Sequence, residues 1–415
     1  MGICPQKNNI MTKRRDLIKS AITLPLMAPL ANGIVSKVKS SKGDYDRDYF
    51  HDLGVRTFIN AAGTYTALTA SLPHPEVIKA IEYAAKYFVR LEDIQDKVGE
   101  RIAELLGAEG AMVTAGAASA ITLGTAAVMT MGDPDKIDRI PNDLTGIKNE
   151  VIIQKTHRVG YDHAIRNCGA KIIEVDNKED LENAINDKTA MMWFLNFNNN
   201  IGKIKDEEWV AIARKHSIPT FIDCAADVPP VENLFRHNKL GFDLVTFSGG
   251  KGLRGPQSAG ILMGKKSLIQ AARKNAPPNG NTVGRGMKVN KEEVLGMLVA
   301  IETYLARDHK KDWALWQSQI DLIGAAAVSA AGVTIEKWIP PIANHVPSIK
   351  IKPDPSVTKI TADELRTALR TGNPSIETMG NNETVDITTW QMIPGEERIV
   401  ANRIREILMN ASMKK

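Results

Sequence analysis

The stretch Asp243–Gly260, DLVTFSGGKGLRGPQSAG, decides the fold class that the sequence predicts. Its residues 244–247 have the apolar pattern of a buried strand, and Lys251 follows in a glycine-rich bend. Ser248 stands just before this bend and Arg254 just after it. A lysine held on short backbone after a buried strand is placed for chemistry, because it is not on a solvated helix face.

A second apolar strand lies upstream in PTFIDCAAD and reaches the acid Asp223. Asp223 and Lys251 are therefore expected at the ends of two buried strands. A pyridoxal phosphate (PLP) enzyme needs these two groups, because its lysine bonds to the cofactor and its carboxylate keeps the pyridine nitrogen protonated. The pair predicts PLP as the cofactor and both residues as catalytic.

A phosphate site is predicted further upstream. A short strand is expected to end at Thr114, and Ala115, Gly116, Ala117 and Ala118 open a helix. A helix start after a small-residue turn offers free N–H groups and the positive end of the helix dipole. We expect the cofactor phosphate there, although a closely packed helix start without a ligand is the alternative reading.

From Glu150 onward, strand candidates alternate with helix candidates. This alternation predicts an α/β fold with a mainly parallel sheet between two layers of helices. Ligands bind at the carboxyl ends of such strands, near which Asn198, Asp223 and Ser248 fall. The expected strands are Ala111–Thr114, Val151–Gln154, Lys171–Val175, Ala190–Phe197, Thr220–Cys224, Leu244–Phe247 and Gly260–Met263, and the expected helices include regions near Tyr161–Cys168, Lys178–Asn186, Asp206–His216 and Pro230–Phe235.

His157 follows the strand VIIQK, where a flat imidazole would stack on a pyridine ring. A packed or solvated histidine is the alternative, and His163 is a second candidate for stacking. Candidate substrate contacts are Asn60 and Thr64 in INAAGTY, whose small residues suggest backbone close to a ligand, together with Arg254 and Arg285. A simple entry turn would also explain INAAGTY, and a solvated basic turn would explain the cations around Arg285.

The chain divides into four regions. Residues 1–33 are a predicted signal peptide, and residues 34–48 a polar linker. Residues 49–310, including an N-terminal segment 49–75, are predicted to form the large PLP-binding domain. Residues 311–415 are predicted to supply a connecting helix and a small α+β domain.

Paired Arg14 and Arg15 precede a short apolar run, Ala21–Ala31, and small residues up to Gly33. This arrangement is typical of a twin-arginine export signal, since the run is too short to span a membrane. That route carries folded proteins, so a PLP enzyme loaded in the cytoplasm would need it. We expect a periplasmic protein with no stable membrane anchor. A cytoplasmic protein with a disordered basic tail is the alternative.

The chain has 415 residues, a mass of 45.4 kDa and a formal net charge of +5, all ordinary for a globular enzyme. We find no basic stripe with interleaved aromatic residues, so nucleic acid is not an expected partner. The chain has three cysteines and no CxxC motif. Their spacing supports neither a disulfide framework nor a zinc site, so we predict no metal.

The motifs together resemble those of fold-type I, aspartate-aminotransferase-like PLP enzymes. More narrowly, they resemble the selenocysteine synthase (seryl-tRNA selenium transferase) related family, which includes D-glucosaminate-6-phosphate ammonia-lyase. The resemblance spans about Thr57 to Met409 and rests on INAAGTY, ERIAELLGAEGAMVTAGAASA, HRVGYDHAIRNCGA, FIDCAAD and TFSGGKGLRGPQSAG.

The resemblance implies a role for each matching position. Lys251 would bond to PLP, Asp223 would pair with the pyridinium, Ser248 and the Thr114–Ala118 turn would bind phosphate, and His157 would stack on the ring. It also implies a homodimer or a higher homo-oligomer, in which INAAGTY lies near the partner's cofactor.

Two departures bear on the substrate. Selenocysteine synthases carry a helical tRNA-binding domain where this chain has its predicted signal, so we do not expect activity on tRNA. Relatives often have an arginine after a Gly-x-Pro-x-Ile/Val stretch, but here Gly372–Ile376 leads into Glu377, Thr378 and Met379.

The expected reaction is α,β-elimination and deamination of an amino acid or amino-sugar acid to a 2-keto acid. An aminotransferase, racemase or aldolase would use the same lysine and acid, and a non-catalytic exported binding protein also remains open. A nucleotide phosphate loop fits poorly, since GxxxxGK[ST] would need glycine at Val245 and Ser or Thr at Gly252.

Overall fold

The computed structural model describes residues 47–413. Residues 47–55, with helix α1 (Tyr49–Asp52), belong to a separate unit from the body that begins at Arg56. The predicted export signal and most of the linker lie outside the described residues. In the part of the chain that is described, no helix is both long and apolar enough to cross a membrane.

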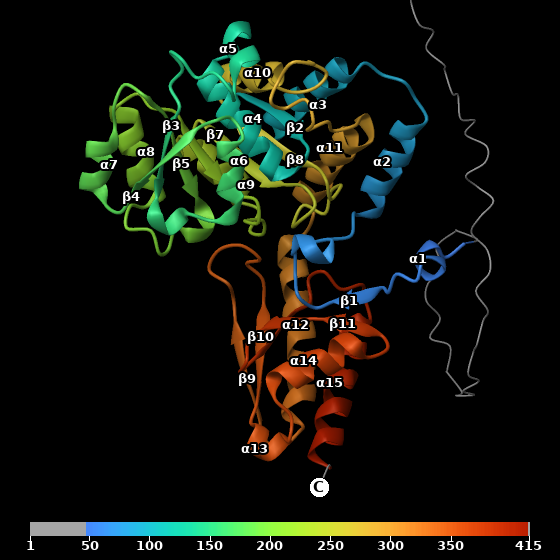
Figure 1. Ribbon diagram of the computed structural model, residues 1–415. Helices are drawn as coiled ribbons and strands as arrows, with labels where there is room; N and C mark the ends of the chain where they lie inside the picture. The colour runs from blue at the N-terminus through green and yellow to red at the C-terminus, as the bar shows by residue number, and fades with distance from the viewer. Residues whose placement is uncertain (1–46, 414–415) are drawn as a thin grey trace, which may run out of the picture. The chain divides into compact units, whose positions relative to one another are not determined.

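Within the body, seven strands form one sheet in the order β2-β8-β7-β6-β5-β3-β4 (Figure 1). Neighbouring strands are parallel except at β8, which runs antiparallel to both of its neighbours. The mainly parallel, seven-stranded sheet that the sequence predicts is confirmed. Its strands are β2 (Gly110–Thr114), β3 (Glu150–Gln154), β4 (Lys171–Val175), β5 (Thr189–Leu195), β6 (Thr220–Asp223), β7 (Leu244–Ser248) and β8 (Gly260–Gly264).

Helix boundaries follow local signals in the sequence. Pro75 occupies the first turn of α2, where its missing N–H costs nothing, and Gly107 ends α3 in the left-handed conformation, with φ +66°. The helix expected at 230–235 instead begins at Asn233, after Pro229 and Pro230, and extends to Leu240. The helices are α2 (Pro75–Ala85), α3 (Leu91–Leu106), α4 (Gly116–Thr130), α5 (Pro134–Arg139), α6 (His163–Arg166), α7 (Lys178–Ala184), α8 (Asp206–Lys215), α9 (Asn233–Leu240), α10 (Lys266–Lys274) and α11 (Lys291–Leu305).

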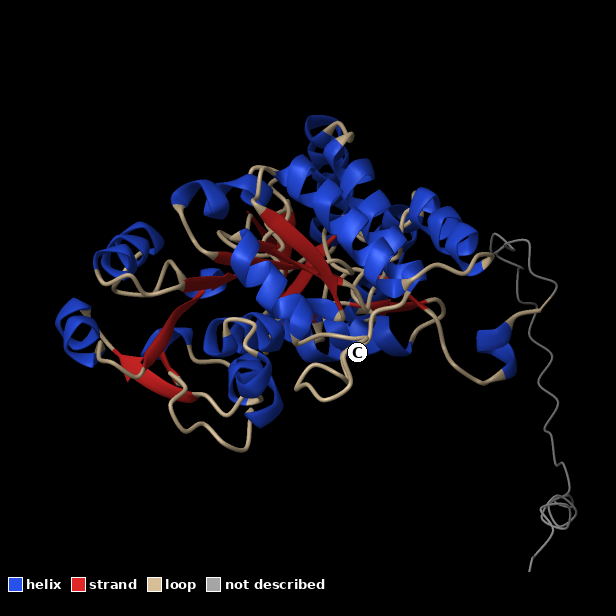
Figure 2. Cartoon of the chain, turned by 90° about the horizontal axis from the view of Figure 1, so that it is seen from above, coloured by secondary structure: helices blue, strands red, loops and turns tan. Residues whose placement is uncertain are grey.

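The sheet lies between two hydrophobic cores. Val151 and Ile153 of β3 enter the core on one face and Ile152 enters the core on the other, because successive side chains of a strand point to opposite sides. Helices α4, α6 and α10 supply side chains to the first core, and α3, α8, α9 and α11 to the second. Figure 2 shows helices on both faces. The functional groups must therefore lie at the strand ends.

The C-terminal region forms the small α+β domain that the sequence predicts. Helix α12 packs against α15, and the sheet has the order β12-β13-β10-β9, with antiparallel pairs. Its elements are α12 (His309–Val328), β9 (Val333–Trp338), β10 (Ser348–Pro353), α13 (Pro355–Thr358), α14 (Ala362–Thr371), β11 (Ser375–Glu377), β12 (Met379–Gly380), β13 (Val385–Thr388) and α15 (Glu396–Ser412).

One boundary differs from the prediction. Strand β1 (Phe58–Asn60), expected in the large domain, pairs in parallel with β11 of the small domain. Ile59 and Ala61 lie in the small domain's hydrophobic core. The assignment of the whole segment 49–75 to the large domain is therefore wrong for β1, because burial of Ile59 and Ala61 holds it on the small domain.

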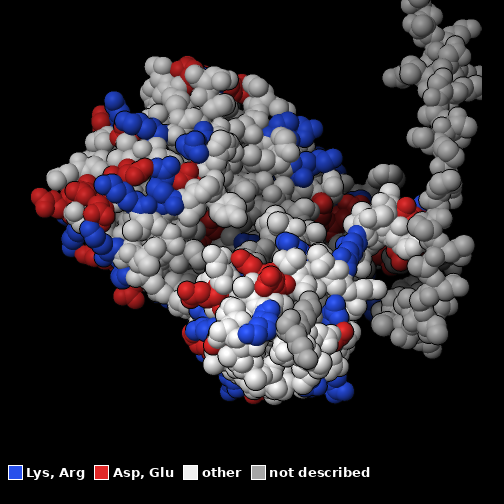
Figure 3. Space-filling view, turned by 60° about the horizontal axis from the view of Figure 1, so that its bottom comes forward, with Lys and Arg blue, Asp and Glu red and all other residues white. Residues whose placement is uncertain are grey.

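Charged side chains of both signs are mixed over the face shown in Figure 3. Blue and red areas lie next to one another there. Salt bridges between exposed side chains include Lys352 with Glu336 and Lys337 with Asp321. A surface of this kind favours solubility without a strong field of one sign.

Candidate active site

Lys251 lies in the tight bend that follows β7. A Cβ atom on Gly250 would come within 2.3 Å of the Gln257 Cα, and one on Gly252 within 1.9 Å of the Val228 carbonyl oxygen. Only glycine fits these two positions, which explains why glycine stands on both sides of Lys251. The packed backbone fixes the base of the lysine side chain.

Two acids act on the Lys251 amine. Asp223 ends β6 next to Thr246 of β7, and its Oδ1 accepts a hydrogen bond of 2.9 Å from the Ala225 N–H. Burial lowers the pKa of Lys251, whereas the charges of Asp223 and Asp227 raise it. Burial raises the pKa of Asp223, and its hydrogen bond and Lys251 oppose that shift. The structure thus brings together the lysine and the acid that the sequence singled out.

Asp227 is a site residue that the sequence analysis did not assign. It is 2% exposed, and its Oδ2 accepts a 2.9 Å hydrogen bond from the Asn196 side chain at the end of β5. Burial and the Asp223 charge raise the pKa of Asp227 to about 7, and the Asn196 hydrogen bond opposes them. The sequence does contain this acid, as the second aspartate of FIDCAAD, but no local sequence pattern shows which way its side chain points.

The predicted phosphate turn adjoins the lysine strand. Thr114 of β2 and Ser248 of β7 both pair with Gly260 of β8, so they flank one residue at the same edge of the sheet. Helix α4 begins at Gly116 without a side-chain cap, since the N-cap residue is Ala115. Its first N–H groups are therefore without a side-chain acceptor, as an anion site requires. The Thr114 hydroxyl donates to the Gly116 carbonyl, so it shapes this turn.

His157 is packed in the core, which is one of the alternatives that the sequence left open. It is fully buried, its Nδ1 accepts a 3.2 Å hydrogen bond from the Leu195 N–H, and its ring meets Phe194 edge-on with 4.3 Å between centroids. A 3-10 turn after β3 directs the imidazole into the core, so the structure favours the packed alternative over stacking on a cofactor ring. Asn198 lies nearby, and its amide donates to the Thr156 carbonyl, joining the loops after β3 and β5.

Asn60 and Thr64 use their side chains to hold the segment after β1. The Asn60 Oδ1 accepts from the N–H groups of Ala62 and Gly63, and the Thr64 hydroxyl donates to Asn344 Oδ1 at 2.6 Å. These bonds explain both residues without a ligand.

The two candidate arginines differ. The Arg254 Nε donates to the Leu72 carbonyl at 2.8 Å, and its own carbonyl accepts from the His74 N–H, so it joins the lysine bend to the chain before α2. Burial lowers the pKa of Arg254, and nearby Arg307 adds to this effect. Arg285 is exposed in the loop between α10 and α11.

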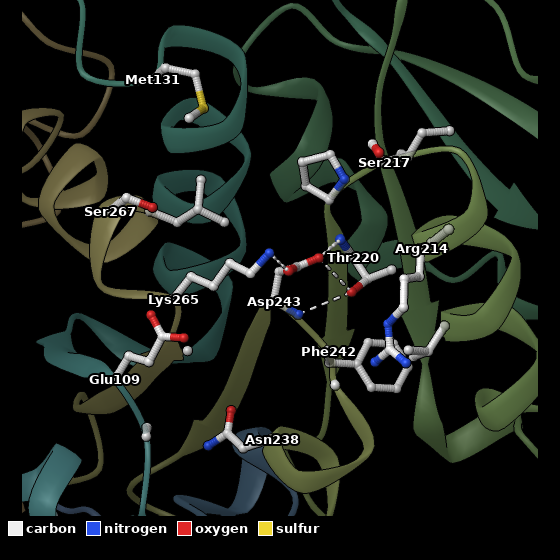
Figure 4. Close-up of a pocket in the computed structure, with 18 of the residues that line it drawn as sticks. Glu109, Met131, Arg214, Ser217, Thr220, Asn238, Phe242, Asp243, Lys265 and Ser267 are labelled. Atoms are coloured by element: carbon white, nitrogen blue, oxygen red, sulfur yellow. Dashed lines mark hydrogen bonds and ion pairs between the residues drawn. The ribbon is translucent and has the colours of Figure 1, made fainter.

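A hollow of about 660 Å³ lies at the opposite edge of the sheet (Figure 4). Residues at the starts of β6 and β7 line it, including Thr220 and Asp243. Asp243 accepts from the Thr220 N–H at 2.7 Å and pairs with Lys265 at 2.6 Å. Because parallel sheets bind ligands at the carboxyl ends of their strands, we assign the functional site to the Lys251 edge, despite the size of this hollow.

Three sequence similarities bear on the family of this chain. The family model described as "SelA: L-seryl-tRNA selenium transferase" matches residues 58–316. D-glucosaminate-6-phosphate ammonia lyase of Salmonella typhimurium (strain 14028s / SGSC 2262) is 28% identical, over 88% of this chain and 98% of the relative. The 5'-C-glycyluridine monooxygenase-decarboxylase of a Streptomyces species is 27% identical, over 89% and 94%.

A solved structure titled "Structure of D-Glucosaminate-6-phosphate Ammonia-lyase" superposes with a TM-score of 0.78. It is 27% identical and covers 89% of this chain and 100% of its own. The predicted fold class, an aspartate-aminotransferase-like large domain with a small α+β domain, is confirmed.

Proposed function

This chain belongs to the L-seryl-tRNA selenium transferase (SelA) family of enzymes, and from that membership we propose that it is a PLP-dependent lyase. The observation that carries the proposal is the buried Lys251 amine beside Asp223, at the edge of the sheet where α4 begins without a cap. The similarity to an ammonia lyase along nearly its whole length supports the reaction type.

The residues present fit PLP. Lys251 would hold it covalently, Asp223 would face its pyridine nitrogen, and the Thr114–Ala118 turn with Ser248 would receive its phosphate. When bound, PLP supplies an electron sink for charge that develops at the substrate Cα. Asp223 suits this role because it is buried, so a nearby cation such as a pyridinium would stabilise its charged form, as its hydrogen bond from Ala225 and the Lys251 charge already do.

Lys251 has the properties of a proton carrier. Burial lowers the pKa of its amine, which increases the neutral fraction available to accept a proton. With a substrate bound, the Lys251 Nζ would be placed to accept the Cα proton and to deliver a proton to the group that leaves Cβ. A 2-amino-3-hydroxy acid would then yield a 2-keto acid and ammonia, since the water lost in elimination is regained in hydrolysis.

The substrate class that we propose is an anionic amino acid or amino-sugar acid. Arg254 supports an anionic substrate, because it lies next to the lysine bend. The charge of Arg307 acts on Arg254, so two cations lie near each other there and would attract an anion. Arg307 is already paired with Asp312 at 2.7 Å, which leaves Arg254 as the more available cation. An amino donor with a carboxylate would place negative charge near it.

We propose two further properties. The enzyme is a homodimer, and it is exported to the periplasm in folded form by the twin-arginine route; a cytoplasmic enzyme is the alternative. The paired arginines at 14 and 15 support export.

The first experiment tests the cofactor. Purified wild-type protein should be yellow, and borohydride should remove the absorbance band and leave a pyridoxyl group on the Lys251 peptide. Lys251→Ala should be colourless, while Lys188→Ala, at an exposed position before β5, should remain yellow. Unmodified Lys251 after incubation with PLP would contradict the proposal.

The second experiment tests the reaction. Candidate 2-amino-3-hydroxy acids and amino-sugar acids are incubated with the yellow protein, and 2-keto acid and ammonia are measured. A lyase releases both in equal amounts without a second substrate. Keto acid formed only with an added keto acceptor would identify an aminotransferase, inversion of the substrate a racemase, and an aldehyde product an aldolase. No turnover by PLP-loaded protein would favour a binding protein.

A further inference from the structure

Three buried side chains form a cluster behind the candidate active site. Cys224 directly follows β6, Asp227 lies in the loop after it, and His237 lies on α9. One donor atom from each residue lies within 4.8 Å of the donor atoms of the other two. Their exposed fractions are 0%, 2% and 0%. Thiol, carboxylate and imidazole are all common metal ligands.

His237 carries the second, independent observation. Among the described residues, neither its Nδ1 nor its Nε2 has a hydrogen-bond partner, although the ring is completely enclosed. Its ring meets that of Phe242 edge-on, with 6.1 Å between the ring centroids. Buried polar nitrogens are normally satisfied, so an unpartnered imidazole next to a thiol and a carboxylate indicates a missing partner.

We propose that Cys224, Asp227 and His237 bind a divalent transition metal ion, and that this ion is zinc. Zinc combines sulfur, nitrogen and oxygen ligands in one site. Its two positive charges would balance one thiolate and one carboxylate, so the centre would be neutral overall, as a buried site requires. Three protein ligands leave one position of a tetrahedral ion for water.

A neighbouring residue supports the site in the way that metal centres are usually supported. The Asn196 side chain donates to Asp227 Oδ2, which orients that carboxylate, and the Cys224 thiol also bonds to it, so the ion would take the place of the thiol proton. The ion would join the end of β6 to α9. Two of its ligands enclose Ala225 and Ala226 in the sequence, since Cys224 precedes these residues and Asp227 follows them, and Cys224 is the next residue after Asp223. The ion would thus hold in place the loop that presents the acids to Lys251. This proposal does not depend on the reaction or on PLP.

The test measures metal in the full chain, purified without a histidine tag. Elemental analysis should find one zinc ion per chain in the wild type, and Cys224→Ser and His237→Ala should lose it. Cys168→Ser is the matched control, because Cys168 is also a buried free cysteine but belongs to the core on the other face of the sheet. It should keep its zinc.

A second measurement uses only the wild-type chain, in case a variant does not fold. Protein stripped by a chelator should lose thermal stability and regain it with zinc. Added cobalt(II) should produce the absorption of a thiolate-bound ion. Wild-type protein from zinc-supplemented medium that is metal-free, gains no stability with zinc and shows no cobalt–thiolate absorption would overturn the proposal. So would zinc that remains in both Cys224→Ser and His237→Ala.

Discussion

At the scale of single residues, Asp223 offers the most direct test of how the site holds its cofactor. Asp223→Asn keeps the size and the hydrogen bond from the Ala225 N–H but removes the negative charge. We expect PLP to bind at least tenfold more weakly, a loss of about 1.4 kcal/mol, and turnover to fall by about a hundredfold or more. Absorbance titration with PLP and assay of ammonia release measure the two effects.

The matched control for this variant is Asp243→Asn. Asp243 is also buried next to the sheet, but at its opposite edge. This change should lower stability without changing PLP affinity. Equal loss of affinity in both variants would show that general destabilisation, and not the charge at Asp223, caused it.

His74 makes stability depend on pH. Burial lowers the pKa of His74 to about 4, Arg254 and Arg307 act in the same direction, and Glu76 and Asp312 oppose them. The unfolded chain, with a histidine pKa of 6.5, therefore binds a proton that the folded chain does not bind between pH 6.5 and 4. Stability from His74 is full above pH 6.5 and is lost as the pH falls toward 4.

Because of this effect, we expect the unfolding free energy of His74→Gln to fall less in acid than that of the wild type. Between pH 7.5 and 5, the variant should lose about 2 kcal/mol less unfolding free energy than the wild type. Urea unfolding at both pH values measures the difference. The exposed His163→Gln should lose as much as the wild type. Parallel curves for wild type and His74→Gln would contradict the prediction.

At the scale of elements, the start of α4 depends on its close approach to β8. A Cβ atom on Gly260 would lie 2.7 Å from the Gly116 carbonyl carbon and 2.8 Å from the Ala117 nitrogen. Gly260→Ala should displace the N–H groups that we assign to phosphate, and weaken PLP binding about tenfold with little change in secondary structure. Gly280→Ala is the control, because nothing lies within 4 Å of its Cβ. Unchanged affinity in Gly260→Ala would place the phosphate elsewhere.

The elements also show which parts of the site a sequence can predict. Strand ends and glycine bends are local patterns, so they located Lys251 and Asp223 together with the Thr114 turn. The Asn196–Asp227 hydrogen bond and the His237 ring depend on how β5, β6 and α9 pack, and no local pattern encodes this. The sequence left open whether His157 packs or stacks for a related reason, because only the turn after β3 sets the direction of its ring. The pairing of β1 with β11 joins residues far apart in sequence, which hydrophobic periodicity does not reveal.

At the scale of the whole molecule, apolar side chains on and after α2 support the proposed dimer. Ile78, Tyr83, Tyr87, Phe88 and Val89 are each about half exposed or more, and Phe88 is fully exposed at 105%. Large apolar side chains exposed in this number within one short segment are costly in water and are typical of a protein interface. We therefore expect this region to lie in the interface with a second copy of the chain.

Light scattering at micromolar concentration should give the mass of two chains for the wild type. Phe88→Glu should shift the protein toward one chain, because a buried unpaired carboxylate opposes association. Val357→Glu, a change at an exposed apolar position on α13 of the small domain, should remain a dimer. If the dimer also completes the cofactor site, Phe88→Glu should bind PLP less tightly at low protein concentration and recover as the concentration rises. A monomeric wild type that binds PLP fully would contradict both expectations, since one chain would then hold the complete site.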